Sequence, residues 1–238
     1  MTANKTVALI TGANKGIGFE IARQLGKRGL IVVLGARDEA KGKAATDKLR
    51  AEGLDAHFVK LEVSSKADVE TLPGFFKERF GRLDVLVNNA GVAEWMNDDL
   101  ATFRRTLEAN VFGVVAVTYA LLPLIRESPA GRVVNQSSAL GSLTSITSAP
   151  EQFGDFINPA YTTSKAALNA FTVALAHKLR GTNVKVNSAH PGWVKTDLGS
   201  DAAPMEVSDG AKSAVALATL PATGPTGGFF HMGERLPW

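Results

Sequence analysis

The chain of 238 residues contains no cysteine. Disulfide bonds, thiolate nucleophiles and cysteine-based metal sites are therefore excluded. Histidine is also scarce, and the four that are present are dispersed, without the H-x-x-H or H-E-x-x-H spacing of helical metal ligands. They are His57, His177, His190 and His231. The sequence does not predict a metal site, so its chemistry must come from other side chains.

A strong charge of one sign is lacking as well. Lys and Arg total 26 against 23 Asp and Glu, a net charge of +3, and the basic residues are scattered along the chain. Nucleic-acid binding normally requires basic residues clustered on one face or element. No nucleic-acid partner is therefore expected.

Long apolar runs are also missing. The longest nearly uncharged stretch, 111–125, ends at Arg126 and Glu127 and is shorter than the ~20 residues that span a bilayer. It predicts a buried helix, and no membrane partner is expected. Residues 1–5 lack the charged and apolar regions of a secretory signal, so a cytoplasmic location is expected.

Short β-rich runs alternate with longer segments of helical pattern. The predicted strands are Val7–Ile10, Ile31–Leu34, His57–Leu61, Val85–Val87, Val133–Val134, Val184–Val186 and Gly228–His231. The predicted helices are Gly16–Arg28, Glu39–Ala51, Lys66–Phe80, Leu100–Ile125, Tyr161–Leu179 and Ser208–Leu220. Continuous apolar strands are typical of a parallel sheet with both faces covered, and the alternation predicts right-handed βαβ units.

We therefore predict one α/β domain over 1–238, a Rossmann-type doubly wound sheet of about seven parallel strands with helices on both faces. No long linker divides it. Two loops are expected on the substrate side, at about 140–160, where Ser, Thr and Pro are frequent, and at about 195–208.

A glycine-rich turn follows the first predicted strand. Residues Thr11–Gly18 read T-G-A-N-K-G-I-G and lead into a segment with helical apolar spacing. Glycine permits backbone conformations closed to other residues, Gly16 lets the backbone approach a phosphate, and Gly18 allows close packing of the helix. The helix N-terminus then faces a pyrophosphate. The order of strand, turn and helix predicts a dinucleotide site.

The spacing Gly-x-x-x-Gly-x-Gly resembles the short-chain dehydrogenase/reductase family, and the resemblance runs nearly end to end. It is carried by motifs in family order: the turn, Asn88–Gly91, Asn110, Ser137-Ser138, Tyr161–Lys165 and Pro191–Thr196. The segments 14–18, 36–38, 121–125, 131–135 and Trp238 are most similar to the NADPH-dependent carbonyl reductase branch. This resemblance implies ketones, aldehydes or quinones as substrates.

The end of the second strand bears on the choice of cofactor. Ala36 occupies the position where similar NAD-dependent proteins carry an aspartate, and Arg37 follows it. A guanidinium suits a 2′-phosphate, and Lys15 in the turn can approach the same group. Two cations without the acid predict NADP(H). Asp38 is expected to cap the next helix or pair with a cation.

The resemblance also implies the residues that bind this cofactor. Glu62 and Val63 are expected near the adenine, the Val194 backbone at the carboxamide, and Thr196 over the phosphates. The full set is Gly12, Asn14, Lys15, Gly16, Ile17, Gly18, Arg37, Glu62, Val63, Asn89, Ala90, Gly91, Tyr161, Lys165, Pro191, Gly192, Val194 and Thr196.

Tyr161 and Lys165 are four residues apart on a predicted helix, so both side chains project from one face. A free tyrosine has a pKa near ~10, and a nearby ammonium group stabilises its phenolate. The resemblance implies that Tyr161 is the general acid that protonates a carbonyl oxygen as hydride arrives from nicotinamide. It further implies that Ser138, rather than Ser137, stabilises the developing alkoxide. Asn110 is expected to hold a water in a proton relay through Lys165.

Ser138, Trp95, Tyr161 and Trp193 are the expected substrate contacts. Ser138 and Tyr161 are 23 positions apart, and in related proteins an insertion before this tyrosine blocks a four-helix interface, so monomer and homo-oligomer both stay open. Two other functions stay open: an oxidative hydroxysteroid or sugar-alcohol dehydrogenase, and a non-catalytic NADP(H)-binding redox sensor. The retained catalytic set argues against the sensor, because a sensor needs no proton relay.

Overall fold

The computed structural model describes residues 5–97 and 99–238. The strands of its one sheet are β1 (Val7–Thr11), β2 (Ile31–Ala36), β3 (Ala56–Lys60), β4 (Val85–Asn88), β5 (Arg132–Gln136), β6 (Lys185–Ala189), β7 (Phe229–His231) and β8 (Glu234–Leu236). Strands β1 and β2 are buried along their whole length, because helices cover both faces of the sheet.

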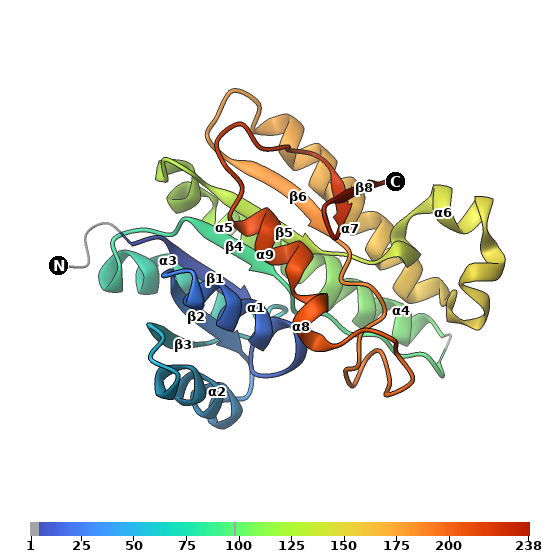
Figure 1. Cartoon of the computed structure of the whole chain (residues 1–238), viewed down its shortest axis with the longest axis horizontal. Helices are drawn as coiled ribbons and strands as arrows, with labels where there is room; N and C mark the ends of the chain where they lie inside the picture. The colour runs from blue at the N-terminus through green and yellow to red at the C-terminus, as the bar shows by residue number, and fades with distance from the viewer. Residues whose placement is uncertain (1–4, 98) are drawn as a thin grey trace.

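The strand order is β3-β2-β1-β4-β5-β6-β7-β8, and neighbours are parallel except for β7 and β8. After β3 the chain crosses back over β1 to build the second half of the sheet (Figure 1). The crossover places a switch point between β1 and β4, where such sheets bind ligands at the carboxyl ends of the strands. Segments that follow β1, β4 and β5 meet at this edge.

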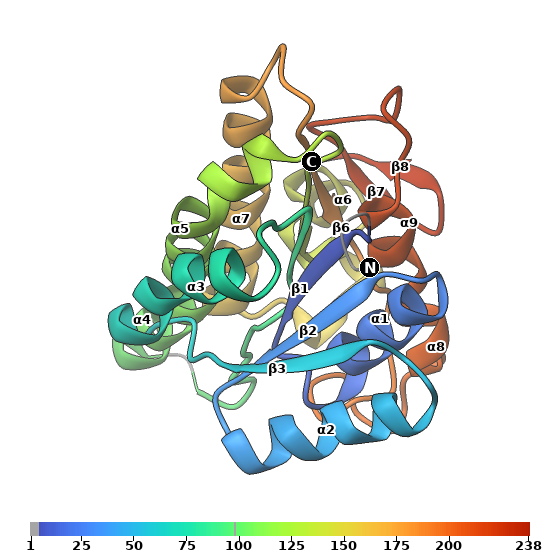
Figure 2. The same cartoon turned by 90° about the vertical axis from the view of Figure 1, so that its left-hand side faces the viewer.

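The helices are α1 (Gly16–Lys27), α2 (Glu39–Ala51), α3 (Lys66–Arg79), α4 (Leu100–Leu107), α5 (Gly113–Glu127), α6 (Leu143–Ser148), α7 (Pro159–Lys178), α8 (Val207–Gly210) and α9 (Lys212–Ala218). Figure 2 shows α3, α5 and α7 on one side of the sheet and α1, α2 and α9 on the other. Phe76 and Leu121 belong to the first apolar layer, and Leu25 and Leu49 belong to the second. The predicted doubly wound fold is confirmed.

The eighth strand was not predicted from the sequence. It pairs antiparallel with β7, Phe229 opposite Leu236, through a turn in which Met232 and Gly233 have φ values of +49° and +94°. The strand covers only Glu234–Leu236 and has no apolar run, so periodicity does not reveal it. The sheet therefore has one antiparallel edge strand beyond the seven parallel strands.

The predicted helix Leu100–Ile125 is divided. A π-helical segment, Glu108–Phe112 (η1), separates α4 from α5 and contains Asn110. Short π-helical segments within α-helices occur frequently at functional sites. The predicted helix Ser208–Leu220 is likewise divided, into α8 and α9. The helix that carries Tyr161 begins earlier than predicted, at Pro159.

Within the described residues, the helical run Leu100–Glu127 has the length and composition of a membrane-spanning helix. These criteria alone are weak, because the core helix of a globular protein meets them too. Val117, Leu121 and Ile125 are fully buried against the sheet, as the predicted buried helix requires.

Candidate active site

The glycine turn links β1 to α1 and has the backbone shape that its sequence predicts. Gly12 and Gly16 have φ values of +64° and +57°, which side chains with a Cβ rarely adopt. A Cβ on Gly12 would also lie 2.9 Å from Cα of Ala90. No side chain caps the start of α1, so its first N–H groups are available to an anionic ligand.

Hydrogen bonds fix this turn to the end of β4. The Thr11 hydroxyl accepts from the backbone N–H groups of Asn89, at 3.0 Å, and Ala90, at 2.9 Å. The Asn89 side-chain amide donates to the Thr11 carbonyl oxygen at 2.9 Å. The two halves of the switch point are thus held in one geometry.

A cleft of about 1010 Å³ opens above these strand ends. Most of the expected cofactor residues line it: Gly12, Asn14, Lys15, Gly16, Ile17, Gly18, Arg37, Glu62, Val63, Asn89, Ala90, Gly91, Tyr161, Lys165, Pro191 and Thr196. Of the described residues that were expected in the site, Gly192, Val194, Asn110, Ser138, Trp95 and Trp193 are not part of the lining. The cleft is large enough for a dinucleotide.

Arg37 and Glu62 lie together at the end of the cleft formed by β2 and β3. The Arg37 side chain is 77% exposed, and its guanidinium is 3.8 Å from the Glu62 carboxylate. Asp38 caps α2 by accepting from the Lys41 backbone N–H at 3.0 Å, as its position in the sequence suggests. The Arg37 guanidinium is thus exposed to the cleft, with the Glu62 carboxylate as its ion-pair partner.

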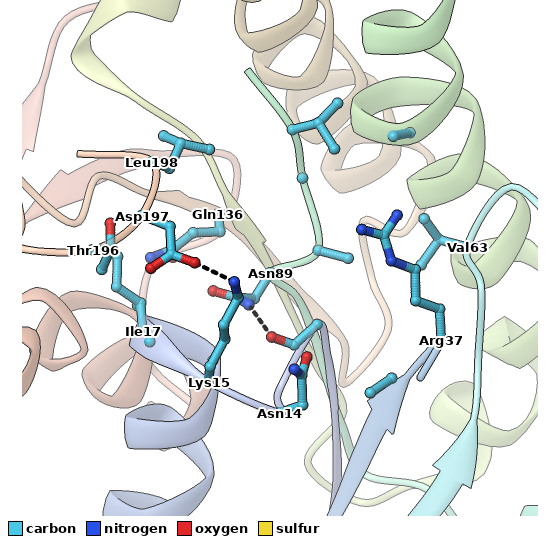
Figure 3. Close-up of a pocket in the computed structure, with 18 of the residues that line it drawn as sticks. Asn14, Lys15, Ile17, Arg37, Val63, Asn89, Gln136, Thr196, Asp197 and Leu198 are labelled. Atoms are coloured by element: carbon cyan, nitrogen blue, oxygen red, sulfur yellow. Dashed lines mark hydrogen bonds and ion pairs between the residues drawn. The ribbon is translucent and has the colours of Figure 1, made fainter. Parts of the chain in front are cut away.

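Lys15 is oriented differently from Arg37. Its ammonium forms an ion pair with Asp197, in the loop after β6 (Figure 3). The hydrogen bond and the positive charge of Lys15 lower the pKa of the Asp197 carboxyl. In this structure the lysine therefore joins the glycine turn to the loop after β6 rather than lying beside Arg37.

Tyr161 and Lys165 project from one face of α7, a turn apart, and are only 7% and 5% exposed. Asn158 caps this helix by accepting from the Tyr161 backbone N–H at 2.9 Å. The Lys165 ammonium lies 5.5 Å from the centre of the Tyr161 ring. Both groups line the cleft.

Burial shifts the acid–base properties of both groups. Loss of hydration raises the pKa of Tyr161 to about 12, although a hydrogen bond with Ser138 partly opposes the shift. Burial lowers the pKa of Lys165 to about 8, and its ammonium donates to the Gln136 carbonyl oxygen at 2.9 Å. At neutral pH the phenol therefore keeps its proton, and the lysine is mostly charged.

The Asn110 side chain forms three hydrogen bonds within the protein. Its Oδ1 accepts from the Val92 backbone N–H at 2.8 Å, and its Nδ2 donates to the Val92 carbonyl oxygen at 2.9 Å and the Ser164 hydroxyl at 3.0 Å. Asn110 thus joins η1 to the strand end after β4 and to α7. Its side chain joins these segments, and the hydrogen bond of the Lys165 ammonium goes to Gln136 instead.

The Pro191–Thr196 segment is attached to the serine-bearing loop through His190. The His190 Nδ1 accepts from the backbone N–H groups of Ala139, at 3.3 Å, and Gly192, at 3.4 Å. Burial lowers the pKa of His190 to about 3, so this nitrogen stays an acceptor. Val194 is buried and bridges to Met205, which places its side chain behind the cleft wall.

Two tryptophans lie against the 195–208 loop, outside the cleft lining, and one of them contacts Tyr161. Trp95 lies against Tyr161, with ring centres 5.0 Å apart, and its indole donates to the Leu198 carbonyl oxygen at 3.1 Å. The Trp193 indole donates to the Gly199 carbonyl oxygen, and the centre of its ring lies 5.2 Å from that of Phe156. Both indoles are thus bonded to the 195–208 loop, and Trp95 lies beside Tyr161.

Two residues of the site were missed in the sequence. Asp197 directly follows the Thr196 motif and binds Lys15, and Gln136 directly precedes Ser137 at the end of β5. A run of two amides, Asn135-Gln136, directly follows the apolar pair Val133-Val134 in this buried strand. That interruption of the apolar pattern was the available signal for Gln136.

A glycine turn at a switch point, with a buried tyrosine and lysine beside it, defines a dinucleotide-dependent oxidoreductase of the Rossmann type. Residues 6–207 match the family model described as short chain dehydrogenase. The chain belongs to the short-chain dehydrogenase family.

Its relatives include several carbonyl reductases. Carbonyl reductase [NADPH] 1 of Mus musculus is 37% identical over 279 residues, covering 100% of both chains. The crystal structure of NADPH-bound carbonyl reductase from chicken fatty liver matches with a TM-score of 0.86 at 26% identity, over 99% of this chain and 100% of that one. Salutaridine reductase from Papaver somniferum matches with a TM-score of 0.84 at 32% identity, over 96% of this chain and 100% of that one. The resemblance to the carbonyl reductase branch is confirmed.

Proposed function

We propose that the chain reduces ketones and aldehydes to alcohols with NADPH, and that Tyr161 donates the proton. The enzyme is an NADP(H)-dependent oxidoreductase of the carbonyl reductase type. The observation that carries the catalytic part of the proposal is the buried Tyr161 phenol, beside the Lys165 ammonium at one end of the cleft.

The residues of the cleft fit NADP(H). Its turn bears left-handed glycines and an uncapped helix start, which suit a pyrophosphate. Ala36 provides no carboxylate at the end of β2, whereas the exposed guanidinium of Arg37 suits a 2′-phosphate. Lys15 lies on the opposite side of the cleft opening and reaches this phosphate by leaving Asp197.

The acid–base chemistry follows from the state of Tyr161. When bound, NADPH supplies the hydride. With a pKa of about 12, Tyr161 holds a proton at neutral pH and can transfer it from its phenolic oxygen to the carbonyl oxygen of the substrate. The Ser138 hydroxyl donates to the same oxygen as negative charge develops. The Lys165 ammonium then stabilises the phenolate that Tyr161 becomes.

Burial disfavours the Tyr161 phenolate in the free protein, so the phenol is in the protonated state that a general acid requires. The Trp95 ring beside Tyr161 and the Trp193 ring beside Phe156 offer flat apolar surfaces to a substrate. We therefore expect flat or bulky apolar carbonyl compounds, quinones included, to be preferred.

Replacement of Tyr161 by phenylalanine tests the proposal, because it removes the proton while keeping the ring. We expect NADPH binding to persist and turnover to fall about 10²- to 10⁴-fold. NADPH oxidation would be followed against a panel of ketones, aldehydes and quinones, with NADH in parallel.

Tyr119 is the matched control, since the chain has only two tyrosines and this one is 47% exposed on α5. Tyr119→Phe should keep the wild-type rate. A Tyr161→Phe enzyme with near-normal turnover would remove Tyr161 as the acid, and wild-type inactivity across the whole panel would favour the redox sensor.

A further inference from the structure

The side chain of Gln136 is buried without a hydrogen-bond partner. The residue is only 6% exposed, and neither Nε2 nor Oε1 has a partner among the described protein groups. An amide that is buried and unpaired costs free energy in the folded protein. A bound ligand that forms hydrogen bonds with this amide would explain why it is buried without a partner in the protein.

Gln136 lies beside the catalytic groups. It is the last residue of β5, it lines the cleft, and its carbonyl oxygen accepts from the Lys165 ammonium at 2.9 Å. Ser137 and Ser138 follow it in the chain. In Figure 3, Gln136, Thr196 and Asp197 all lie on the side of the cleft away from Arg37.

The direction of the side chain follows from the alternation of β5. Val134, two residues earlier, packs in the apolar layer that contains Ala13 and contacts Ile17, so Gln136 projects toward the same face. Asn135 projects to the opposite face, where its side chain bonds with Asn88 and Thr172. Gln136 therefore stands at the end of an apolar layer that also packs against the glycine turn, and it lines the cleft there.

The two ends of a bound dinucleotide are assigned by the chemistry around them. Hydride must be delivered next to Tyr161, so the nicotinamide lies at this end and the adenosine lies near Arg37 and Glu62. A nicotinamide carboxamide carries one carbonyl acceptor and one amino donor. A glutamine amide is complementary to both.

We propose that the Gln136 side-chain amide hydrogen-bonds the carboxamide of the nicotinamide, in addition to the Val194 backbone expected there, and so orients the ring that delivers hydride. The amide turns into the cleft by rotation about its side-chain torsions, and no hydrogen bond within the described protein is broken in doing so. The inference rests on the proposed function, because it requires a nicotinamide dinucleotide in the cleft. Gln136 is a positioning residue, and Tyr161 remains the proton donor.

Gln136→Met tests this proposal, because methionine has a similar volume and no amide. We expect the Kd for NADPH to rise about fivefold, as for the loss of one hydrogen bond of ordinary strength. The Kd for 2′-phospho-ADP-ribose, which lacks the nicotinamide, should not change. The free variant should unfold at the same urea concentration as the wild type or a higher one, because the unpaired amide is gone.

A cofactor analogue adds a second readout that does not depend on turnover. In the 3-acetylpyridine analogue of NADPH a methyl group replaces the amino donor, so the wild type should bind it less tightly than NADPH. Gln136→Met should show a smaller difference between these two ligands. Gln136→Leu repeats the comparison if the methionine variant does not fold.

Unchanged NADPH affinity in a folded variant would overturn the proposal. Equal weakening of NADPH and 2′-phospho-ADP-ribose would also overturn it, because the residue would then act only through the shape of the cleft. A wild-type protein that binds neither ligand would instead contradict the proposed function.

Discussion

At the scale of single residues, the ion pair between Lys15 and Asp197 competes with the expected role of Lys15 as a phosphate ligand. Both side chains are largely exposed, 67% and 78%, so the pair is screened by water and weak. Weak pairing suits a lysine that exchanges one anionic partner for another. Asp197 also places a negative charge at the opening of a site for a phosphorylated cofactor.

Asp197→Asn should therefore tighten NADPH binding by about two- to threefold and leave NADH binding unchanged. Only NADPH carries the 2′-phosphate that competes with Asp197 for Lys15. Titration of both cofactors by protein fluorescence measures the two Kd values. In a Lys15→Ala background the same substitution should lose most of its effect. Weaker NADPH binding by Asp197→Asn would mean that the carboxylate supports the loop instead.

At the scale of elements, the packing of α1 against the end of β4 depends on Gly18. A Cβ at this position would lie 2.4 Å from Nδ2 of Asn89 and 2.6 Å from the Gly12 carbonyl oxygen. The amide of Asn89 is the group that ties β4 to the glycine turn. A methyl group here therefore separates the two halves of the nucleotide site.

Gly18→Ala should lower the free energy of unfolding by about 1–3 kcal/mol, as overpacking does in well-filled interiors, and should weaken NADPH binding. Urea unfolding gives the first quantity. Gly74→Ala is the matched control, since Gly74 is exposed within α3 and an added Cβ meets nothing within 4 Å. That control should be stabilised by about 0.4–1 kcal/mol. Equal stability of the two variants would contradict the packing argument.

At the scale of the whole molecule, Trp238 links the far edge of the sheet to the substrate-side loop. Its ring stacks on Phe229 of β7, with centres 5.6 Å apart and an angle of 13° between the planes. Its carbonyl oxygen accepts from the Thr144 backbone N–H of α6 at 2.9 Å. The loop between β5 and α7 is thereby held by a residue almost a hundred positions further along the chain.

Trp238→Ala should lower the free energy of unfolding by about 2 kcal/mol and speed amide hydrogen exchange across α6. We expect KM for the carbonyl substrate to rise while the Kd for NADPH stays constant, because α6 lies outside the cofactor cleft. Trp238→Phe preserves a stacked ring and should behave as the wild type. A rise in the NADPH Kd equal to the rise in KM would contradict this division of roles.

Much of this organisation could be predicted from the chain alone. Strands β1 to β4 were located to within one or two residues, because their apolar runs are continuous and helices flank them. The glycine turn and the Tyr161–Lys165 spacing are local, since a strand end and a helical turn fix their geometry. The hairpin to β8 and the π-helical break at Asn110 were missed, because neither changes the apolar pattern. The cytoplasmic location stays a prediction, and the oligomeric state stays open.

The sequence by itself determined the parallel sheet, the turn for a pyrophosphate, and a tyrosine and lysine on one helical face, since each depends on residues close together in the chain. Only the tertiary structure decided the partners of the charged and polar groups. Lys15 pairs with Asp197, 182 positions away, and Lys165 bonds to Gln136, 29 positions away. These pairings depend on which strand ends meet at the switch point. A local sequence pattern does not show how close residues far apart in the chain lie in space.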